Sequence, residues 1–238
     1  MVYEKEDSVL ASECGSLATL SLLGAVEKVQ DHVCEFFGQL GIDQRNLRKN
    51  YNSMWVFVRN KIVLTKELDW GERFTVKCFI TKISTLTMQV DTVFITKSGE
   101  QALYSRIEIC LLDFLTSKLK RISEIGDLSL EMIESPLLNL EFNKLRDAEN
   151  AENINQIRVG ASSIDFCKHT NNTQYVKYVI DSLSVSELEK KRPQLIEIAY
   201  VAQSRENDVL DIFKTYFEGG NYYILKKGNE VVARCLIK

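Results

Sequence analysis

The sequence predicts an α+β protein in which two similar units follow each other, each a long helix wrapped by a curved antiparallel sheet. Four observations predict this class. The order of a helix followed by several strands occurs twice, and the strand-like runs alternate apolar and polar residues. The alternating strand–helix–strand order of a doubly wound fold does not occur in this pattern. The length of 238 residues suits two domains of roughly 100–120 residues each.

The first unit is expected to begin with a helix and to continue with strands. Apolar residues at helical spacing predict a helix over residues 17–40, which Gly41 would end. Ser98-Gly99 has the composition of a hairpin turn. Alternating apolar and polar residues predict three strands, over 74–80, 86–90 and 102–113.

An acidic and then polar connection is expected between the units. It contains Pro136, and its last ten residues carry few apolar side chains. The predicted organisation is therefore a first domain over residues 1–122, a linker over 123–155 and a second domain over 156–238 that carries the candidate site.

The second unit repeats the order of the first. A helix is predicted from about Asn172, and Ser186 with Glu189 has the spacing of a capping box for a short helix that Pro193 closes. Strands are then predicted over 196–202, 209–217, 222–225 and 231–237. Glu206-Asn207-Asp208 occupies the place before a strand that Trp70-Gly71-Glu72 occupies in the first unit.

Composition excludes several classes of protein. A net charge of −3 and a pI near 5.6 argue against a nucleic-acid partner. We find no apolar run of membrane-spanning length and no basic start of a secretory signal, so we expect a cytoplasmic protein with no membrane partner. Six cysteines without a CxxC pair and two histidines favour reduced thiols and predict no metal site and no cofactor.

One short stretch combines a carboxylate, a thiol and an imidazole. Asp165, Cys167 and His169 are spaced by two, so in an extended segment their side chains would project to one side. A helix begins directly afterwards, with Thr170 or Asn171 as its N-cap, and its first N–H groups could stabilise an oxyanion. The alternative stays open that Asp165 forms a turn, Cys167 is a small buried residue and His169 lies at the surface.

The same place in the first unit has no comparable chemistry. If the two halves align there, Ser12 and Ser16 replace Asp165 and His169. The sequence therefore predicts a single site in the chain.

These residues resemble a known family. The pattern Asp-x-Cys-x-His-Thr-Asn-Asn over residues 165–172, followed by Tyr175, is similar to the D-x-N-x-H-V-N-N-x-x-Y signature of plant and bacterial acyl–acyl carrier protein (acyl-ACP) thioesterases. Three further stretches are similar to the family: Trp55-Val56 with Arg59, Trp70-Gly71-Glu72, and Leu195-Ile196-Glu197-Ile198-Ala199-Tyr200.

The resemblance implies two tandem hotdog domains and the hydrolysis of fatty acyl-ACP thioesters to free fatty acid, which terminates fatty acid biosynthesis. It implies acyl carrier protein as the partner and no cofactor. The catalytic positions that it implies are Asp165, Cys167, His169 and Gln203. The substrate-binding candidates are Asn171 and Asn172 beside the helix start, and Trp55 and Phe57 as apolar lining.

Two of the four catalytic positions depart from the family, because Cys167 stands for its asparagine and Gln203 for its glutamate. Glutamine orients a water but cannot take its proton. Three consequences stay open: His169 held by Asp165 is the sole base, Cys167 is a nucleophile, or the domain binds acyl chains without hydrolysis. An acyl-CoA thioesterase is a further alternative. Glu206 or Asp208 could supply the missing carboxylate, although exposed turn charges are the simpler interpretation.

Acyl carrier protein is acidic, so docking on it would require a basic surface. Two clusters are candidates: Lys118 with Lys120 and Arg121, and Lys190 with Lys191 and Arg192. A monomer and a homodimer both remain open.

Overall fold

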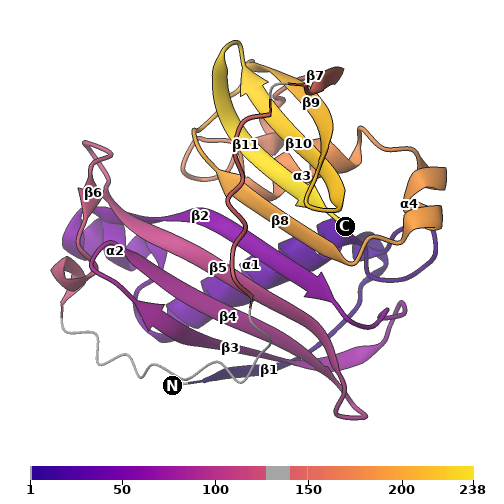
Figure 1. Ribbon diagram of the computed structural model, residues 1–238. Helices are drawn as coiled ribbons and strands as arrows, with labels where there is room; N and C mark the ends of the chain where they lie inside the picture. Colours follow the sequence, from indigo (N-terminus) through magenta and orange to yellow (C-terminus); the bar gives the residue numbers. More distant parts are fainter. Residues whose placement is uncertain (1, 127–139, 149) are drawn as a thin grey trace. The chain divides into compact units, whose positions relative to one another are not determined.

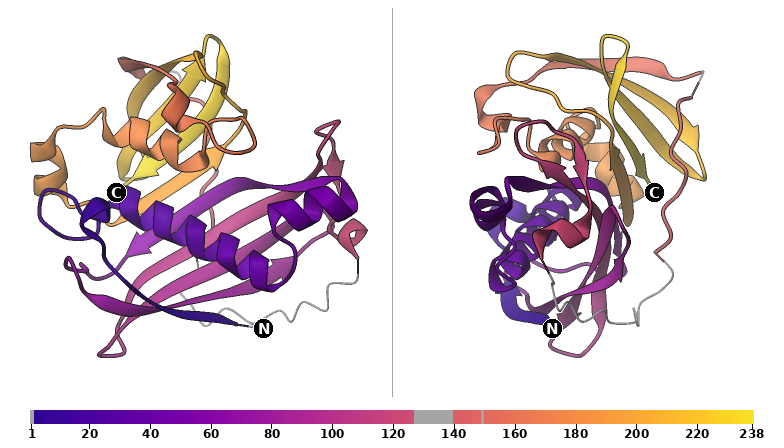
Figure 2. Two further views of the ribbon diagram at one scale, coloured as in Figure 1. Left: turned by 180° about the vertical axis from the view of Figure 1, so that it is seen from behind. Right: turned by 90° about the vertical axis from the view of Figure 1, so that its left-hand side faces the viewer.

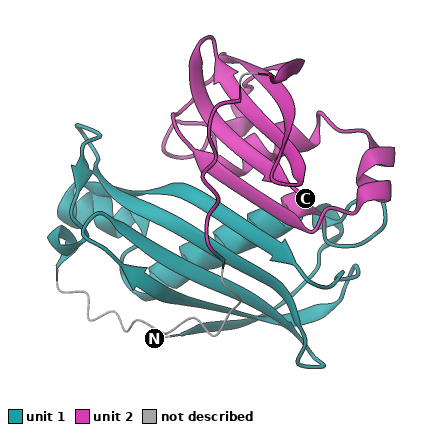
Figure 3. Cartoon of the chain, viewed as in Figure 1, with its two compact units in different colours: residues 1–20, 24–140 teal, residues 21–23, 141–238 magenta. Residues whose placement is uncertain are grey.

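The computed structural model describes residues 2–126, 140–148 and 150–238. The chain divides into two compact units, of which the first comprises residues 1–20 and 24–140 and the second 21–23 and 141–238 (Figure 3). Residues 127–139 of the predicted linker lie outside the described residues. The predicted domain boundaries at 122 and 156 stay a prediction.

The first unit contains an antiparallel sheet in the order β1-β3-β4-β5-β2, with the short β6 paired to β5 (Figure 1). Its strands are β1 (Tyr3–Ser8), β2 (Ser53–Leu64), β3 (Arg73–Ile83), β4 (Thr87–Thr96), β5 (Gln101–Asp113) and β6 (Leu119–Lys120). The predicted alternation is seen in β3, where Phe74, Val76, Cys78 and Ile80 are buried. Gly99, at the hairpin between β4 and β5, has a φ of 85°, which suits glycine.

The helix α1 (Leu22–Gln39) lies across one face of this sheet (Figures 1 and 2). Its aromatic residues meet rings of three strands: Phe36 contacts Tyr3 of β1, His32 contacts Phe94 of β4, and Phe37 contacts Trp55 of β2. The helix α2 (Gln44–Tyr51) follows, capped by the Asp43 side chain. Two short 3-10 helices, Ala11–Glu13 and Ile122–Ile125, complete the described part of this unit.

The predicted start of α1 at residue 17 is wrong. The chain between Gly15 and Leu20 forms a tight turn, in which Gly15 N–H donates to the Thr19 carbonyl at 2.9 Å. Ala18 takes a φ of 57° there, which a helix does not allow. The helix therefore begins only at Leu22.

The strands of the second unit pair antiparallel in the order β8-β11-β10-β9-β7. Its strands are β7 (Glu152–Arg158), β8 (Leu195–Tyr200), β9 (Val209–Phe217), β10 (Gly220–Lys227) and β11 (Glu230–Ile237). Its helices are α3 (Asn172–Ile180) and α4 (Val185–Lys191), with a 3-10 turn at Ala161–Ser163. The predicted strands over 196–202, 209–217, 222–225 and 231–237 correspond to β8, β9, β10 and β11.

One local prediction in this unit is wrong, and one stretch of the predicted linker is a strand. The capping box of α4 uses Ser184 and Glu187, two residues earlier than the predicted pair Ser186 and Glu189. Residues 152–155, which we expect in the linker, belong to β7, which pairs with β9. This strand lies at the sheet edge and buries little, so its polar sequence resembles that of an exposed connection.

Among the residues that the structure describes, no helix has the length and apolar character required to cross a membrane.

Candidate active site

The segment that carries Asp165, Cys167 and His169 is a tight turn. Asp165 N–H donates to the His169 carbonyl at 2.9 Å, and Lys168 N–H donates to the Asp165 carbonyl at 2.9 Å. Ile164 and Thr170 pair across its base, and Lys168 has a φ of 63°. The expectation of an extended segment is therefore wrong, because the hydrogen bonds across the turn reverse the chain.

Asp165 forms this turn with its side chain. Its Oδ1 accepts a hydrogen bond from Cys167 N–H at 2.8 Å and a longer one from His169 N–H at 3.4 Å. Among the described bonds, the carboxylate of Asp165 is bonded to backbone amides and not to the imidazole ring. The turn-forming interpretation that the sequence left open thus describes the geometry of Asp165, while its charge still lies near His169.

The helix α3 begins directly after the turn. Asn171 is its N-cap, and the Asn171 side chain accepts a hydrogen bond from Thr173 N–H at 3.1 Å. This bond satisfies one of the first-turn amides, and Asn172 is the first residue of the helix. The predicted choice between Thr170 and Asn171 as the cap is therefore decided for Asn171.

The segment that carries Gln203 lies beside the turn. Thr170 N–H donates to the Ser204 carbonyl at 2.9 Å. His169 comes directly before Thr170, and Gln203 comes directly before Ser204. The bond therefore brings the two predicted positions into one loop cluster. Gln203 is exposed and His169 is half-buried.

The surroundings of His169 hold the pKa of its imidazole below the ordinary value. Burial is the largest cause, the positive charge of Arg205 acts in the same direction, and the negative charge of Asp165 opposes both. A histidine with a lowered pKa is neutral at neutral pH and can accept a proton.

Glu206 and Asp208 lie at the turn before β9 and match the simpler interpretation as turn charges. Asp208 Oδ2 accepts a hydrogen bond from Arg205 N–H at 2.8 Å and lies 3.6 Å from Lys227 Nζ. Glu206 is exposed. The Asp208 carboxylate is thus committed to holding the turn.

Trp55 and Phe57 belong to the first unit, whereas the loop cluster belongs to the second. Both side chains are buried, at 4% and 8% exposure, in strand β2. The Trp55 indole Nε1–H donates to the Ile42 carbonyl at 2.8 Å. Within their unit they are core residues, and their role in lining a substrate site stays a proposal.

The first unit contains a turn of the same build, which gives the alignment of the two halves. Gly15 N–H donates to the Thr19 carbonyl at 2.9 Å, as Asp165 does to His169, and Leu20 N–H donates to the Leu68 carbonyl at 2.8 Å. Gly15 and Thr19 therefore match Asp165 and His169. The expected match to Ser12 and Ser16 is wrong by three residues.

The turn before β3 repeats the turn before β9 in the same way. Gly71 N–H donates to the Val9 carbonyl at 2.9 Å, and Asn207 N–H donates to the Val159 carbonyl at 2.9 Å. Both Gly71 and Asn207 have positive φ angles, of 78° and 71°. The sequence match between residues 70–72 and 206–208 is therefore confirmed.

Three side chains lie beneath the loop cluster and were not predicted as site residues: Thr170, Tyr175 and Ser204. They are buried and bonded to one another. The sequence marks Thr170 only as a possible helix cap, Tyr175 only as part of the family pattern, and Ser204 only by its place next to Gln203. Arg205, whose charge acts on His169, was missed as well.

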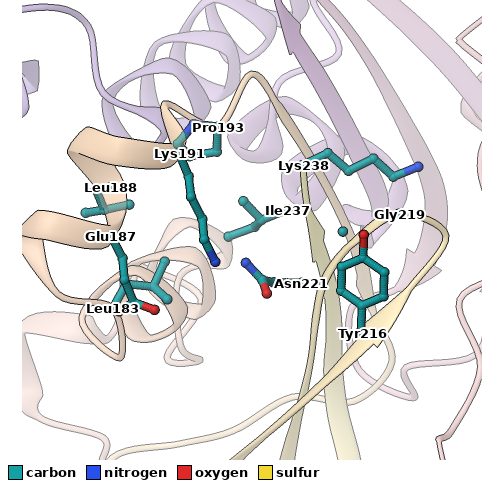
Figure 4. A pocket seen from close by; sticks show the side chains of 11 residues that line it. Leu183, Glu187, Leu188, Lys191, Pro193, Tyr216, Gly219, Asn221, Ile237 and Lys238 are labelled. Carbon is teal, nitrogen blue, oxygen red and sulfur yellow. The ribbon is translucent and has the colours of Figure 1, made fainter.

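A separate pocket of about 280 Å³ lies between α4 and the turn that joins β9 to β10 (Figure 4). None of the predicted site residues lines it. Its walls are formed by Leu183, Glu187, Leu188, Lys191, Pro193, Tyr216, Gly219, Gly220, Asn221, Ile237 and Lys238. Within the described ranges, no cluster of three His, Cys, Asp or Glu side chains is suited to a metal ion.

Comparison with protein families gives a match within the second unit. Residues 146–234 match the model of the acyl-ACP thioesterase C-terminal domain. A palmitoyl-acyl carrier protein thioesterase of Arabidopsis thaliana is 23% identical over an alignment of 224 residues, and the match covers 88% of this chain and 54% of the relative. The chain thus spans about half the length of the curated relatives that it matches.

Solved structures cover both units. An acyl-ACP thioesterase from Bacteroides thetaiotaomicron has a TM-score of 0.88 at 21% identity and covers 99% of this chain and 96% of its own. A 12:0-ACP thioesterase from Umbellularia californica has a TM-score of 0.87 at 19% identity, over 100% of this chain and 96% of its own. The predicted α+β class with two tandem hotdog units is therefore confirmed, and so is the resemblance to acyl-ACP thioesterases.

Proposed function

We propose that this chain hydrolyses fatty acyl-ACP thioesters, because it resembles the acyl-ACP thioesterases in both its C-terminal family match and its double hotdog fold. The products are a free fatty acid and the carrier protein, and the reaction would end fatty acid synthesis. The observation that carries the proposal is the juxtaposition of a neutral, half-buried His169 with the Gln203 segment through the bond from Thr170 to Ser204.

His169 would act as the general base in this reaction. Its imidazole takes a proton from a water as the water oxygen attacks the thioester carbonyl carbon. When the tetrahedral intermediate collapses, the carbon–sulfur bond breaks and the imidazolium returns the proton to the departing thiolate. The lowered pKa of His169 supports both steps, since it keeps the base free at neutral pH and makes the imidazolium a better acid.

Gln203 would orient the attacking water through its side-chain amide, because it cannot accept the proton. Asp165 would act through the turn, by holding the backbone amides of Cys167 and His169. We also assign Cys167 as a catalytic position. Asn172 lies at the first turn of α3, where unpaired amides and the helix dipole would stabilise an oxyanion.

The basic cluster Lys190, Lys191 and Arg192 is our choice for the carrier-protein docking surface. It belongs to the same unit as His169, and all three side chains are exposed. Lys191 also borders the pocket beside α4. An acidic partner would be attracted to such a surface. Lys120 of the other cluster is already bonded to the Tyr51 carbonyl at 3.0 Å.

We further propose a cytoplasmic location. All six cysteines are thiols outside any disulfide, and thiols stay reduced in that compartment. The choice between monomer and homodimer is left to measurement by analytical ultracentrifugation.

The test of the proposed function is thiol release from acyl-ACP substrates of several chain lengths by the natural protein and by His169→Ala. We expect turnover that is reduced at least about 100-fold in the variant, since general-base catalysis contributes that much. Unchanged thermal unfolding would show that the variant is folded. Turnover that survives in His169→Ala would remove His169 from the mechanism.

The alternative function is a binding domain that holds acyl chains without hydrolysing them. Cys167 and Gln203 favour it, because both depart from the family pattern. Its signature would be tight binding of acyl-ACP with no turnover at any chain length. Turnover of acyl-CoA in preference to acyl-ACP would instead indicate an acyl-CoA thioesterase.

A further inference from the structure

Three buried hydroxyl groups lie beneath the loop cluster. Ser204, Tyr175 and Thr170 have exposed fractions of 0%, 2% and 5%. Ser204 follows Gln203, Thr170 follows His169, and Tyr175 belongs to α3. The three groups therefore come from the three segments that meet at the site.

The hydroxyls form one connected set of hydrogen bonds. Ser204 Oγ lies 2.7 Å from Thr170 Oγ1 and 2.9 Å from Tyr175 Oη. Ser204 N–H donates to Tyr175 Oη at 2.9 Å, and Thr170 Oγ1 donates to the Ser204 carbonyl at 3.1 Å. Ser204 thus engages its amide, its carbonyl and its side chain with the two neighbouring segments.

The donor of every bond can be assigned without conflict. The Thr170 hydroxyl donates its proton to the Ser204 carbonyl, so Thr170 Oγ1 accepts a hydrogen bond from Ser204 Oγ–H. Ser204 Oγ then accepts from Tyr175 Oη–H. Each hydroxyl donates once and accepts once, so the network has a single direction and no proton left over. A fully satisfied buried network of this kind makes an arrangement rigid.

The first unit shows that the turn does not require these hydroxyls. Leu20 and Leu68 occupy the corresponding places, and Leu20 N–H donates to the Leu68 carbonyl at 2.8 Å. Both leucines are buried, at 7% and 1% exposure. An apolar pair therefore supports the same backbone pairing in the unit that lacks the candidate chemistry.

We propose that Ser204 is a positioning residue, which with Thr170 and Tyr175 holds His169 and Gln203 in register for activation of one water. This inference rests on the proposed function. Tyr175 fixes the network to α3, Thr170 fixes His169, and the backbone of Ser204 fixes Gln203. Apolar side chains would hold the backbone, as they do in the first unit, but without the directional bonds that define the side-chain register.

Precise register matters because a displacement of about 1 Å at a reacting group can cost about 100-fold in rate. The network does not touch the substrate, so its loss is expected to lower kcat and to leave KM almost unchanged. A loss of general stability would not produce this split in a protein that remains folded at the assay temperature.

The first experiment measures kcat and KM for acyl-ACP in Ser204→Ala. We expect kcat to fall about 10- to 100-fold, with KM within twofold of the natural value. The matched control is Ser105→Ala, which removes an equally buried serine that donates to Asn60 Oδ1 at 3.1 Å in the first unit. That control should retain its kcat. A kcat within twofold of the natural value in Ser204→Ala would overturn the proposal.

The second experiment follows the imidazole protons of His169 by NMR as the pH is varied, and needs no turnover. A loosened turn would expose His169 to water, so the midpoint of the His169 titration should move to higher pH in Ser204→Ala. An unmoved His169 midpoint would contradict the positioning role. If the natural protein lacks turnover but the midpoint moves, the hydrolase proposal and the activation of water fail, while the holding of His169 by the network is supported.

A third variant tests whether the effect of Ser204→Ala comes from loss of the network or from a local loss of structure. Tyr175→Phe removes one hydroxyl and keeps the ring, and the double variant with Ser204→Ala closes a mutant cycle. We expect a double-variant loss in kcat close to the larger single loss, because the residues act as a unit. Strictly multiplied losses would argue against a shared network.

Discussion

His169 lies between two charges that act on the pKa of its imidazole in opposite directions. Arg205 lowers the pKa, as burial does, and Asp165 raises it. The rate of a base-catalysed step depends on the neutral fraction of the base, so its acid limb reports this pKa. The two neighbours therefore offer a direct test of the role of His169.

We predict that Arg205→Gln moves the acid limb of kcat/KM to higher pH. Loss of the positive charge stabilises the imidazolium, which raises the pKa of His169 and keeps the base protonated over a wider acidic range. The measurement is a pH–rate profile in the presence of acyl-ACP. Lys177→Gln serves as the control, because it removes an exposed charge that pairs with Asp181. A shift to lower pH in Arg205→Gln would contradict the assignment.

The second prediction at the scale of the residue concerns Gln203→Glu. A carboxylate at this position can take a proton from water, which the amide cannot, so we expect kcat to rise at least about 10-fold. Gln194→Glu adds the same charge at another exposed position and should change nothing. An unchanged or lower kcat in Gln203→Glu would mean that the amide already performs the role required there.

Among the elements, α1 and β1 are joined by a cluster of charged side chains. Lys28 is buried, and its Nζ lies 2.8 Å from Asp7 Oδ2 and 3.0 Å from Glu13 Oε1. His32 lies 2.9 Å from both Asp7 Oδ2 and Tyr3 Oη. Tyr3 in turn donates to Glu35 Oε2 at 2.6 Å. The edge strand is thereby held to the helix by polar bonds as well as by packing.

This cluster predicts a loss of stability in acid. Burial opposes ionisation of Asp7, but the bonds from Lys28 and His32 outweigh it and lower its pKa. Bonds from Lys5 and Tyr3 lower the pKa of Glu35. A depressed pKa contributes stability that is complete above the unfolded value, about 3.9 for Asp and 4.3 for Glu, and is lost as the pH falls through the folded value.

The measurement is the urea midpoint between pH 6 and pH 2.5, for the natural protein and for Asp7→Asn. We expect the midpoint of the natural protein to fall over the acid range. Asp7→Asn should be less stable at pH 6 and should lose less on acidification. Parallel curves for the two proteins would show that Asp7 contributes nothing to the acid response.

A pair of glycines in α1 gives a second prediction for this element. Replacing a helical glycine by alanine ordinarily stabilises by about 1 kcal/mol. A Cβ at Gly24 would lie 2.4 Å from the Glu13 carbonyl oxygen, whereas a Cβ at Gly38 would meet nothing within 4 Å. We therefore expect Gly24→Ala to destabilise by about 1–3 kcal/mol and Gly38→Ala to stabilise by up to about 1 kcal/mol. Urea unfolding measures both, and equal effects would refute the close approach.

At the scale of the whole molecule, a net charge of −3 has to be reconciled with an acidic carrier protein. Overall repulsion would slow the encounter unless a local basic surface compensates for it. The exposed cluster Lys190, Lys191 and Arg192 is the surface that we propose. Docking through it would depend on salt, because exposed charges are screened over about 8 Å at physiological ionic strength.

We predict that reversing the charge in Lys190→Glu with Lys191→Glu raises KM for acyl-ACP about 10-fold and leaves kcat unchanged. A rim charge acts mainly on association, so a short acyl-CoA substrate should be hydrolysed as before. The same reversal at Lys118, which is exposed in the first unit, is the control. A rise in KM only in the Lys118 variant would move the docking surface to that unit.

The sequence alone determined the fold class, most of the elements and the residues to examine. Alternation such as that of Phe74, Val76, Cys78 and Ile80 survives in the structure because burial of one sheet face is a local, periodic property. The match of residues 70–72 with 206–208 was likewise readable, because a positive φ restricts which residue can stand at a turn. Residues 152–155 of the edge strand β7 could not be recognised as a strand from the sequence, because an edge strand that is paired on one side only and buries little has no apolar pattern.

Only the tertiary structure decided how the candidate site is built. Spacing by two suggested an extended segment, yet hydrogen bonds across the turn bring His169 back to Asp165. Nothing local indicates that Thr170, Tyr175 and Ser204 share one network, because they come from segments up to 34 residues apart. Contacts of this range depend on the packing of α3 against the sheet, and periodicity along a single segment carries no information about them.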